Sequence, residues 1–386
     1  MSDKVSETYR ICTRCIYDTK VPKIAFDENG VCNYCKMIDD LKSQYHTGTP
    51  AGEEKFAEIV EQIRKDGKGK KYDCVVGVSG GTDSSYMIVK AVEWGLRPLA
   101  VHYDNTWNTA IATENIRKIL GKLKVDLYTH VVDNKESDDI FRSFFLANVP
   151  EIDGPTDIAL AETMYRAAAK YKVKYVLEGH SFIAEGVSPL STAYVDGGYI
   201  RNIHEKFGKI RMKTFPNMTF AAFMKWILFF RIKKIRPLWY INYSKQEAKV
   251  MLMKDYGWQD YGGHHLENRM TAFNHSIYFP QKFKIDQRNN TLSAVVRAGL
   301  KTREAAIEEY KTPPHIEPEL VEYFKKRLGF SDEEYTAIMN GPRKNFRDYK
   351  TYKKRFERLR PLFFLLAKAN LVPMSFYIKY TSKSEI

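Results

Sequence analysis

The feature that most constrains this chain is the stretch Val75–Ser85, which reads VVGVSGGTDSS. Its first residues are mostly β-branched and predict a short buried strand. A turn with two adjacent glycines follows, and the apolar residues from Tyr86 to Trp94 recur at helical spacing. Such a strand–turn–helix unit presents free backbone N–H groups at the helix N-terminus, and glycines let the backbone approach an anion closely. The stretch therefore predicts a phosphate-binding loop.

The motif differs from the commonest nucleotide-binding patterns. No Gly-Lys-Ser/Thr follows the glycines, which excludes a Walker loop, and GxGxxG is absent here. The residues SGGTDS instead resemble the PP-loop (SGGxDS) of ATP pyrophosphatases. That resemblance implies an enzyme that splits ATP into AMP and pyrophosphate. Such enzymes adenylate a carbonyl oxygen, and a nitrogen or sulfur nucleophile then displaces AMP. The alternative is a glycine turn capped by serines.

Predicted strands and helices alternate after this loop. Helical stretches separate three further predicted strands, at residues 97–103, 126–132 and 174–177. This order predicts an α/β fold with a doubly wound, mostly parallel sheet. Because ligands bind at the carboxyl ends of parallel strands, we expect four residues there to contact the nucleotide: Asp104, Asn105, Gly179 and His180. For His180 a purely structural role is the alternative.

A separate unit precedes the α/β region. Two CxxC pairs with sixteen residues between them supply four cysteines: Cys12, Cys15, Cys32 and Cys35. This spacing predicts a tetrahedral Zn²⁺ site that stabilises a module too short for a core of its own. An iron–sulfur cluster and disulfides are the alternatives. We expect three parts: a four-cysteine zinc module at 1–50, a PP-loop domain at 51–210, and a mainly helical substrate and partner region at 211–386.

The net charge and two apolar runs are compatible with several classes of partner. Lys+Arg exceed Asp+Glu by 61 − 47 = 14, so the surface attracts RNA, nucleotide-sugars or acidic lipids. The run Phe220–Phe230 is too short to span a bilayer, and it predicts a buried helix or a peripheral contact with an anionic membrane. The run Arg360–Tyr380 is similar. The N-terminus lacks the apolar segment of a signal peptide, so we expect a cytoplasmic protein with reduced cysteines.

A more specific resemblance rests on several motifs together. These are the CxxC pairs, SGGTDSS, EGHSFIAEG at 178–186, and the stretch from Ile235 to Arg288 that contains GGHHLENR. In this combination the chain resembles the N-acetyl sugar amidotransferases of bacterial surface-polysaccharide biosynthesis. The resemblance implies that ATP activates the acetamido oxygen of a nucleotide-linked N-acetyl sugar, and that ammonia then leaves an acetamidino group. It also implies partners similar to the glutaminase and cyclase subunits of histidine biosynthesis. No glutaminase signature is visible in this chain.

The same resemblance suggests roles for individual residues. The expected pyrophosphate and ATP contacts are Ser79, Gly80, Gly81, Thr82, Asp83, Ser84 and Ser85, with Asp83 near Mg²⁺. The expected catalytic residues are Asp83, Ser84, His265, Glu267 and Arg269. Arg269 would bind pyrophosphate or an acid group of the substrate, and His265 or Glu267 would take a proton from ammonia. Helix capping and surface solvation are the alternative for the last three.

Two other functions compete with this prediction. PP-loop proteins with cysteine modules and basic surfaces also thiolate tRNA, which the net charge would suit. Sulfur transfer generally uses further cysteines, however, and only Cys74 remains outside the module, within a predicted strand. The other possibility is a non-enzymatic scaffold of a membrane glycan complex, against which the intact SGGTDSS argues.

Overall fold

A parallel sheet forms the centre of the molecule. The computed structural model describes residues 9–187, 194–262, 266–313, 316–369 and 371–383. Its five-stranded sheet has the order β3-β2-β1-β4-β5, and all neighbouring strands run parallel. The strands are β1 (Cys74–Gly77), β2 (Pro98–Asp104), β3 (Leu127–Val131), β4 (Tyr175–Leu177) and β5 (Lys233–Ile235). The predicted α/β fold with a parallel sheet is confirmed.

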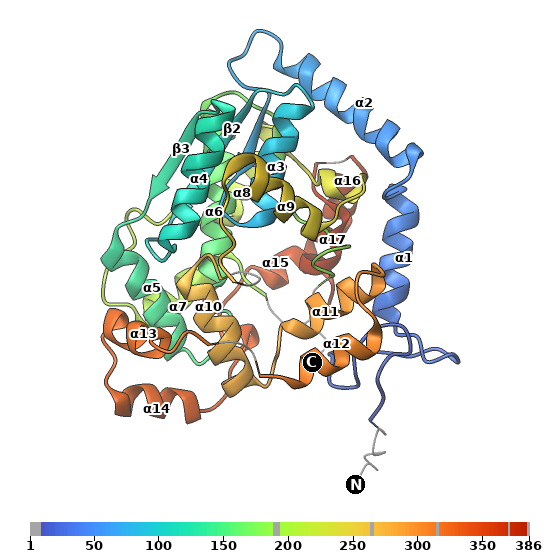
Figure 1. The fold of residues 1–386 in the computed structure, drawn as a ribbon. Coiled ribbons are helices and arrows are strands. Elements are labelled where there is room, and N and C mark those ends of the chain that lie inside the picture. Colours follow the sequence, from blue (N-terminus) through green and yellow to red (C-terminus); the bar gives the residue numbers. More distant parts are fainter. Residues whose placement is uncertain (1–8, 188–193, 263–265, 314–315, 370, 384–386) are drawn as a thin grey trace.

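Helices surround the sheet and make up most of the second half of the chain (Figure 1). The first group is α1 (Asn33–Tyr45), α2 (Pro50–Gly67), α3 (Thr82–Glu93), α4 (Ala110–Leu123), α5 (Asn134–Leu146), α6 (Gly154–Lys170) and α7 (Gly197–Phe207). Then come α8 (Phe220–Met224), the π-helical turn η1 (Lys225–Phe229), the 3-10 turn η2 (Pro237–Trp239), α9 (Lys245–Tyr256), α10 (Arg269–Phe273) and the π-helix η3 (Asn274–Phe283). The last are α11 (Arg288–Arg297), α12 (Arg303–Lys311), α13 (Leu320–Leu328), α14 (Asp332–Asn340), η4 (Phe346–Asp348), α15 (Lys353–Arg358), α16 (Arg360–Lys368) and α17 (Met374–Thr381).

β1 lies in the middle of the sheet, and its side chains fill a core on each face. Val75 is fully buried in a cluster that includes residues of α6 and α16, whereas Val76 is fully buried in a cluster that includes residues of α2, α3 and α4. Successive residues of a strand point to opposite faces, so a strand covered on both sides is apolar throughout. This double covering is the reason that the β-branched run at 75–78 forms the central strand.

The strand order reverses at β1. β2 and β3 lie on one side of it, and β4 and β5 lie on the other. In an open parallel sheet, such a reversal leaves a crevice at the carboxyl ends of the two strands that flank it. The loops that follow β1 and β4 therefore meet at the position where α/β proteins bind ligands.

The outermost strand on the β4 side comes from the second half of the chain. β5 pairs with β4 in the register Val176↔Lys234. The sheet thus extends beyond residue 210, where the sequence suggested the end of the PP-loop domain. A strand of three residues with two lysines carries little periodic signal, so only its pairing identifies it. The three-part division of the chain stays a prediction.

The apolar run Phe220–Phe230 forms α8 and η1 and is partly buried. The ring of Phe223 contacts Phe363 of α16 and Phe376 of α17. In contrast, Phe229 is 78% exposed. Among the described residues, we find no helix whose length and apolar character would allow it to cross a bilayer.

Candidate active site and metal centre

The PP-loop forms a compact turn between β1 and α3. The backbone N–H of Ser79 donates to Ser84 Oγ (3.2 Å), and the N–H of Gly81 donates to Ser79 Oγ (3.3 Å). Ser84 Oγ in turn donates to the Gly81 carbonyl (3.2 Å). Thr82 and Ser85 are buried in the first turn of α3. The predicted strand–turn–helix arrangement is thus confirmed, and the hydroxyls of Ser79 and Ser84 brace the turn at the N-terminus of the helix.

Gly80 makes the closest backbone approach in this loop. Its φ is +82°, and a Cβ added there would lie 2.2 Å from the carbonyl oxygen of Ala112 in α4. The Gly80 carbonyl accepts a hydrogen bond from Trp258 Nε1 (2.9 Å). Both the backbone angle and the close contact require glycine at this position.

The loop after β4 touches the PP-loop directly. A Cβ at Gly179 would lie 2.7 Å from the carbonyl oxygen of Asp83, so the two backbones are in contact. His180 follows, and its Nδ1 accepts a hydrogen bond from Trp239 Nε1 (3.2 Å). Its Nε2 lies 3.8 Å from the carboxylate of Glu185. Gly179 and His180 therefore lie where the sequence placed them, at the crevice beside the PP-loop.

Asp83 is bound by two residues that the sequence analysis did not identify. Lys245 Nζ lies 2.6 Å from Asp83 Oδ2, and the hydroxyl of Tyr243 donates to Asp83 Oδ1. Burial alone would lower the pKa of Lys245, but the charge of Asp83, together with other nearby carboxylates, raises it overall. Lys245 thus stays protonated at the PP-loop. It is separated from Asp83 by 162 residues, and no local pattern in the sequence marks it.

A second segment crosses the opening of the PP-loop. The Glu267 carbonyl accepts a hydrogen bond from the N–H of Thr109 (2.9 Å). The side chain of Glu267 lies over Gly81, since a Cβ added at Gly81 would lie 2.8 Å from Glu267 Oε1. Arg269 begins α10, but its guanidinium lies over the ring of Tyr323 in α13, 4.7 Å from the centroid. The structure thus places Glu267 at the loop, whereas the guanidinium of Arg269 lies over Tyr323 and 3.6 Å from the carboxylate of Glu317. His265 lies outside the described residues.

The two residues after β2 have different environments. Asp104 Oδ1 accepts from the N–H of Thr106 (2.7 Å) and is partly exposed. Asn105 is 1% exposed, and its amide donates to Thr156 Oγ1 (3.2 Å) and accepts from Asn268 Nδ2 (3.0 Å). These contacts join the β2 loop to the start of α10. The expected nucleotide contact of Asp104 and Asn105 stays a prediction.

The four cysteines of the N-terminal module surround one point. All four are buried, and their Sγ atoms lie within 4.8 Å of one another. The separations of 3.9 Å (Cys12–Cys35) and 3.8 Å (Cys15–Cys32) are far longer than a disulfide bond of about 2.05 Å. They match the edge of about 3.8 Å for a tetrahedron with Zn–S bonds of about 2.3 Å. In a four-iron cluster each thiolate would bind a different iron and the sulfurs would lie farther apart. The set therefore fits one tetrahedral ion.

An arginine from the second half of the chain compensates the charge of this centre. Arg297 of α11 donates to Cys35 Sγ (3.2 Å) and to Cys15 Sγ (3.3 Å). Four thiolates around a divalent cation leave two negative charges in a buried site, and a guanidinium that donates to two of the sulfurs offsets part of this. Sequence reasoning missed Arg297 because it lies 262 residues from Cys35.

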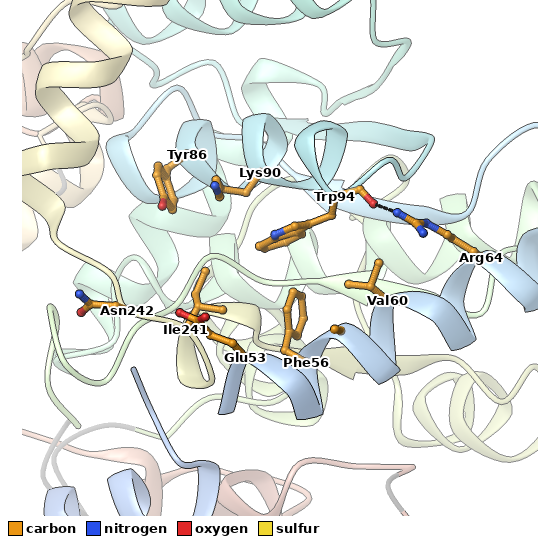
Figure 2. A pocket seen from close by; sticks show the side chains of 10 residues that line it. Glu53, Phe56, Val60, Arg64, Tyr86, Lys90, Trp94, Ile241 and Asn242 are labelled. Carbon is orange, nitrogen blue, oxygen red and sulfur yellow. Dashed lines mark hydrogen bonds between the residues drawn. The ribbon is translucent and has the colours of Figure 1, made fainter. Parts of the chain in front are cut away.

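A cleft of about 440 Å³ lies elsewhere, between α2, α3 and the residues after η2. Figure 2 shows Phe56 and Val60 of α2 facing Trp94, the residue after α3, and the Arg64 guanidinium donates to the Trp94 carbonyl. None of its lining residues belongs to Ser79–Ser85. The convergence of hydroxyls, backbone N–H groups and the partly buried Lys245 makes the PP-loop the better candidate for the active site.

A comparison with protein families identifies the C-terminal region. Residues 267–360 match the family described as "LPS biosynthesis protein WbpG-like, C-terminal domain". This match confirms, for that region, the resemblance to a family of surface-polysaccharide biosynthesis. The matched segment begins at Glu267, which lies over the PP-loop.

Further relatives are more distant. The protein "Uncharacterized protein MJ1599" of Methanocaldococcus jannaschii is 23% identical over 320 residues, which are 82% of this chain and 98% of that protein. NMN synthetase from Francisella tularensis has 13% identity and a TM-score of 0.33, over 73% of this chain and 95% of that one. The U34-tRNA thiolase NcsA of Methanococcus maripaludis, solved with its [4Fe-4S] cluster, has 12% identity and a TM-score of 0.31, over 80% and 89%. At these scores the structural likeness carries no argument about function.

Proposed function

We propose that this chain is an ATP-dependent amidotransferase of lipopolysaccharide biosynthesis. Its substrate would be a nucleotide-activated N-acetyl sugar, and its products an acetamidino sugar, AMP and pyrophosphate. One observation carries the proposal. The PP-loop, with Lys245 paired to Asp83, lies at the crevice between β1 and β4, and the same chain contains a segment that matches a WbpG-like domain.

The chemistry explains why ATP is needed. An amide carbon is a poor electrophile, and its oxygen is a poor leaving group. In the proposed first step the acetamido oxygen bonds to the α-phosphorus of ATP, and pyrophosphate leaves. In the second step ammonia bonds to the amide carbon, the bond from carbon to the adenylated oxygen breaks, and AMP departs. Loss of one proton from the former ammonia nitrogen then leaves the amidinium ion, the protonated form of the product.

The residues around the PP-loop suit the first step. α3 begins at Thr82, directly after the glycine turn, and the N–H groups of a helix N-terminus can bind the departing pyrophosphate. Lys245 is already charged there, so it can stabilise the negative charge that develops on the leaving group. In the described parts of the chain, the four cysteines are the one group of side chains close enough to hold a metal. We expect Mg²⁺ to accompany the triphosphate and to neutralise phosphate charge, with Asp83 as its expected protein ligand.

The second step needs a group that accepts a proton from ammonia. The carboxylate of Glu267 lies over Gly81 of the PP-loop. We propose that it takes this proton, and His265 remains the other candidate from the sequence. Ammonia would come from partner proteins of the glutaminase and cyclase type, because no glutaminase signature is visible in the sequence.

The direct test measures pyrophosphate release. ATP, Mg²⁺ and ammonium are combined with UDP- and CMP-linked N-acetyl sugars, and the mass of each product is recorded. The proposal expects release with one sugar and a product in which NH replaces O. Release that needs no sugar, or a sugar product of unchanged mass, would contradict it.

A matched pair of lysines in α9 tests the site itself. Lys245 contacts Asp83, whereas Lys249, one turn later, pairs with Asp260 (2.7 Å). Lys245→Met should abolish pyrophosphate release, and Lys249→Met should leave it unchanged. Equal activity of the two variants would remove Lys245 from the mechanism.

The alternative of tRNA thiolation makes a different prediction. Its sulfur carrier would have to be accessible, but Cys74 is fully buried in β1, and burial raises the pKa of its thiol well above the usual range. The other four cysteines surround the metal centre. Pyrophosphate release that depends on tRNA, with none for any sugar, would nevertheless favour this alternative.

A further inference from the structure

The cysteine module lies against the loop that carries His180. Helix α1 contains Cys35, and Ile38 lies one turn further along it. Ile38 is 2% exposed and packs in one buried cluster with Phe182 and Trp239. Trp239 is the residue that donates to His180 Nδ1. A helix anchored by a metal ligand thus forms the wall behind the His180 loop.

A second connection runs through α11. The hydroxyl of Tyr17, two residues after Cys15, donates to Asn290 Oδ1 (2.5 Å). Asn290 Nδ2 then donates to the carbonyl of Glu185 (2.8 Å) in the His180 loop. Close packing accompanies this bond, because a Cβ at Gly186 would lie 2.5 Å from Asn290 Oδ1. One asparagine therefore binds the metal module with its oxygen and the active-site loop with its nitrogen.

The two sets of contacts are independent. One is apolar and comes from α1, and the other is a pair of hydrogen bonds that pass through α11. Figure 1 shows α11 and α12 beside the N-terminal region, on the side of the molecule that also holds α1. Arg303 of α12 adds a bond to the Cys12 carbonyl (2.8 Å), so the module is attached to the body around its metal-binding loops.

We propose that metal occupancy of the four-cysteine centre positions the His180 loop, with Asn290 and Ile38 as the positioning residues. A module of this size has too little core to fold without its ion, so loss of the metal would release α1 and Tyr17 together. The loop at 178–187 would then lose both its apolar wall and its anchor. This coupling does not depend on the reaction proposed above, because it concerns the order of the loop and not turnover.

The loop contains two amides that report on its order. The N–H of Glu185 donates to the Ser181 carbonyl (2.9 Å), and that of Gly186 to the Phe182 carbonyl (3.1 Å). Hydrogen exchange at these amides can be compared with exchange at Val78, whose N–H donates to Val101 within the sheet (2.9 Å). Removal of the metal by a chelator, and Cys32→Ser separately, should speed exchange at Glu185 and Gly186 by about tenfold or more, with Val78 little changed.

A second pair of variants keeps the metal in place. Tyr17→Phe removes only the hydroxyl that binds Asn290, and Tyr34→Phe removes a hydroxyl that donates to Pro22 inside the module (2.6 Å). With metal content unchanged in both, Tyr17→Phe should speed exchange in the loop severalfold, and Tyr34→Phe should not. Unchanged exchange at Glu185 and Gly186 after metal removal would overturn the proposal. Equal acceleration at Val78 would also overturn it, because that would indicate global unfolding rather than coupling to this loop.

Discussion

Two penalties oppose alanine at Gly80 of the PP-loop, a left-handed backbone and a steric clash, and two other glycines show each penalty alone. Gly69 has φ +77° with no atom within 4 Å of an added Cβ, so Gly69→Ala meets only the backbone penalty. Gly179 has an ordinary φ but lies 2.7 Å from the Asp83 carbonyl oxygen, so Gly179→Ala meets only the steric penalty. Gly80 combines φ +82° with a contact of 2.2 Å to Ala112.

The magnitudes follow from these geometries. A left-handed backbone costs an L-residue about 1–2 kcal/mol, and this is the expected loss for Gly69→Ala. Overpacking against a backbone that cannot turn aside costs about 1–3 kcal/mol, which is expected for Gly179→Ala. Gly80→Ala should lose the two together, about 2–5 kcal/mol, a large part of the stability of a typical protein.

Urea denaturation of the wild type and the three variants measures these losses, provided that the m-value stays constant. We expect Gly80→Ala to have the lowest free energy of unfolding of the three variants. Gly69→Ala should lose as much as Gly179→Ala or less. Gly80→Ala and Gly179→Ala should also weaken ATP binding, whereas Gly69→Ala should not. A Gly80→Ala variant no less stable than Gly69→Ala would refute the close contact between the PP-loop and α4.

Three further predictions concern charge, metal and surface. Burial alone would raise the pKa of Glu178, but two neighbouring cations lower it to about 2, below its unfolded value of about 4.3. Its stabilisation is therefore present above about pH 4.5 and lost toward pH 2, so Glu178→Gln should flatten the fall of the urea midpoint with acid. Arg297→Met should weaken metal binding about 10–100-fold in competition with a chelator, while Lys301→Met, which removes a charge bonded to Glu309, should not. The third prediction tests contact of the apolar run Phe220–Phe230 with anionic membranes. Phe229→Ser should lower co-sedimentation with phosphatidylglycerol vesicles about tenfold. Val131→Ser changes an exposed residue of β3 and should leave co-sedimentation unchanged.

Much of the fold could be predicted because its signals are local. The run at 75–78 and the apolar strand at 97–103 were identified within one residue of β1 and β2, since buried parallel strands are apolar along their whole length. The glycines of the PP-loop and the two CxxC pairs lie within short segments, so their spacing alone indicated an anion site and a four-cysteine cluster. The strand β5 was missed, because three residues contain too few side chains for a period to appear.

By itself, then, the sequence determined the order of β1 to β4, the glycine turn between β1 and α3 and the four-cysteine cluster. Only the tertiary structure decided that Lys245 binds Asp83, that Asn105 is buried among polar partners, and that Arg297 donates to the cysteine sulfurs. The physical reason is distance along the chain. Periodicity and turn chemistry act over a few residues, whereas these contacts join residues more than 150 positions apart, and a charge has no visible partner until the chain has folded around it.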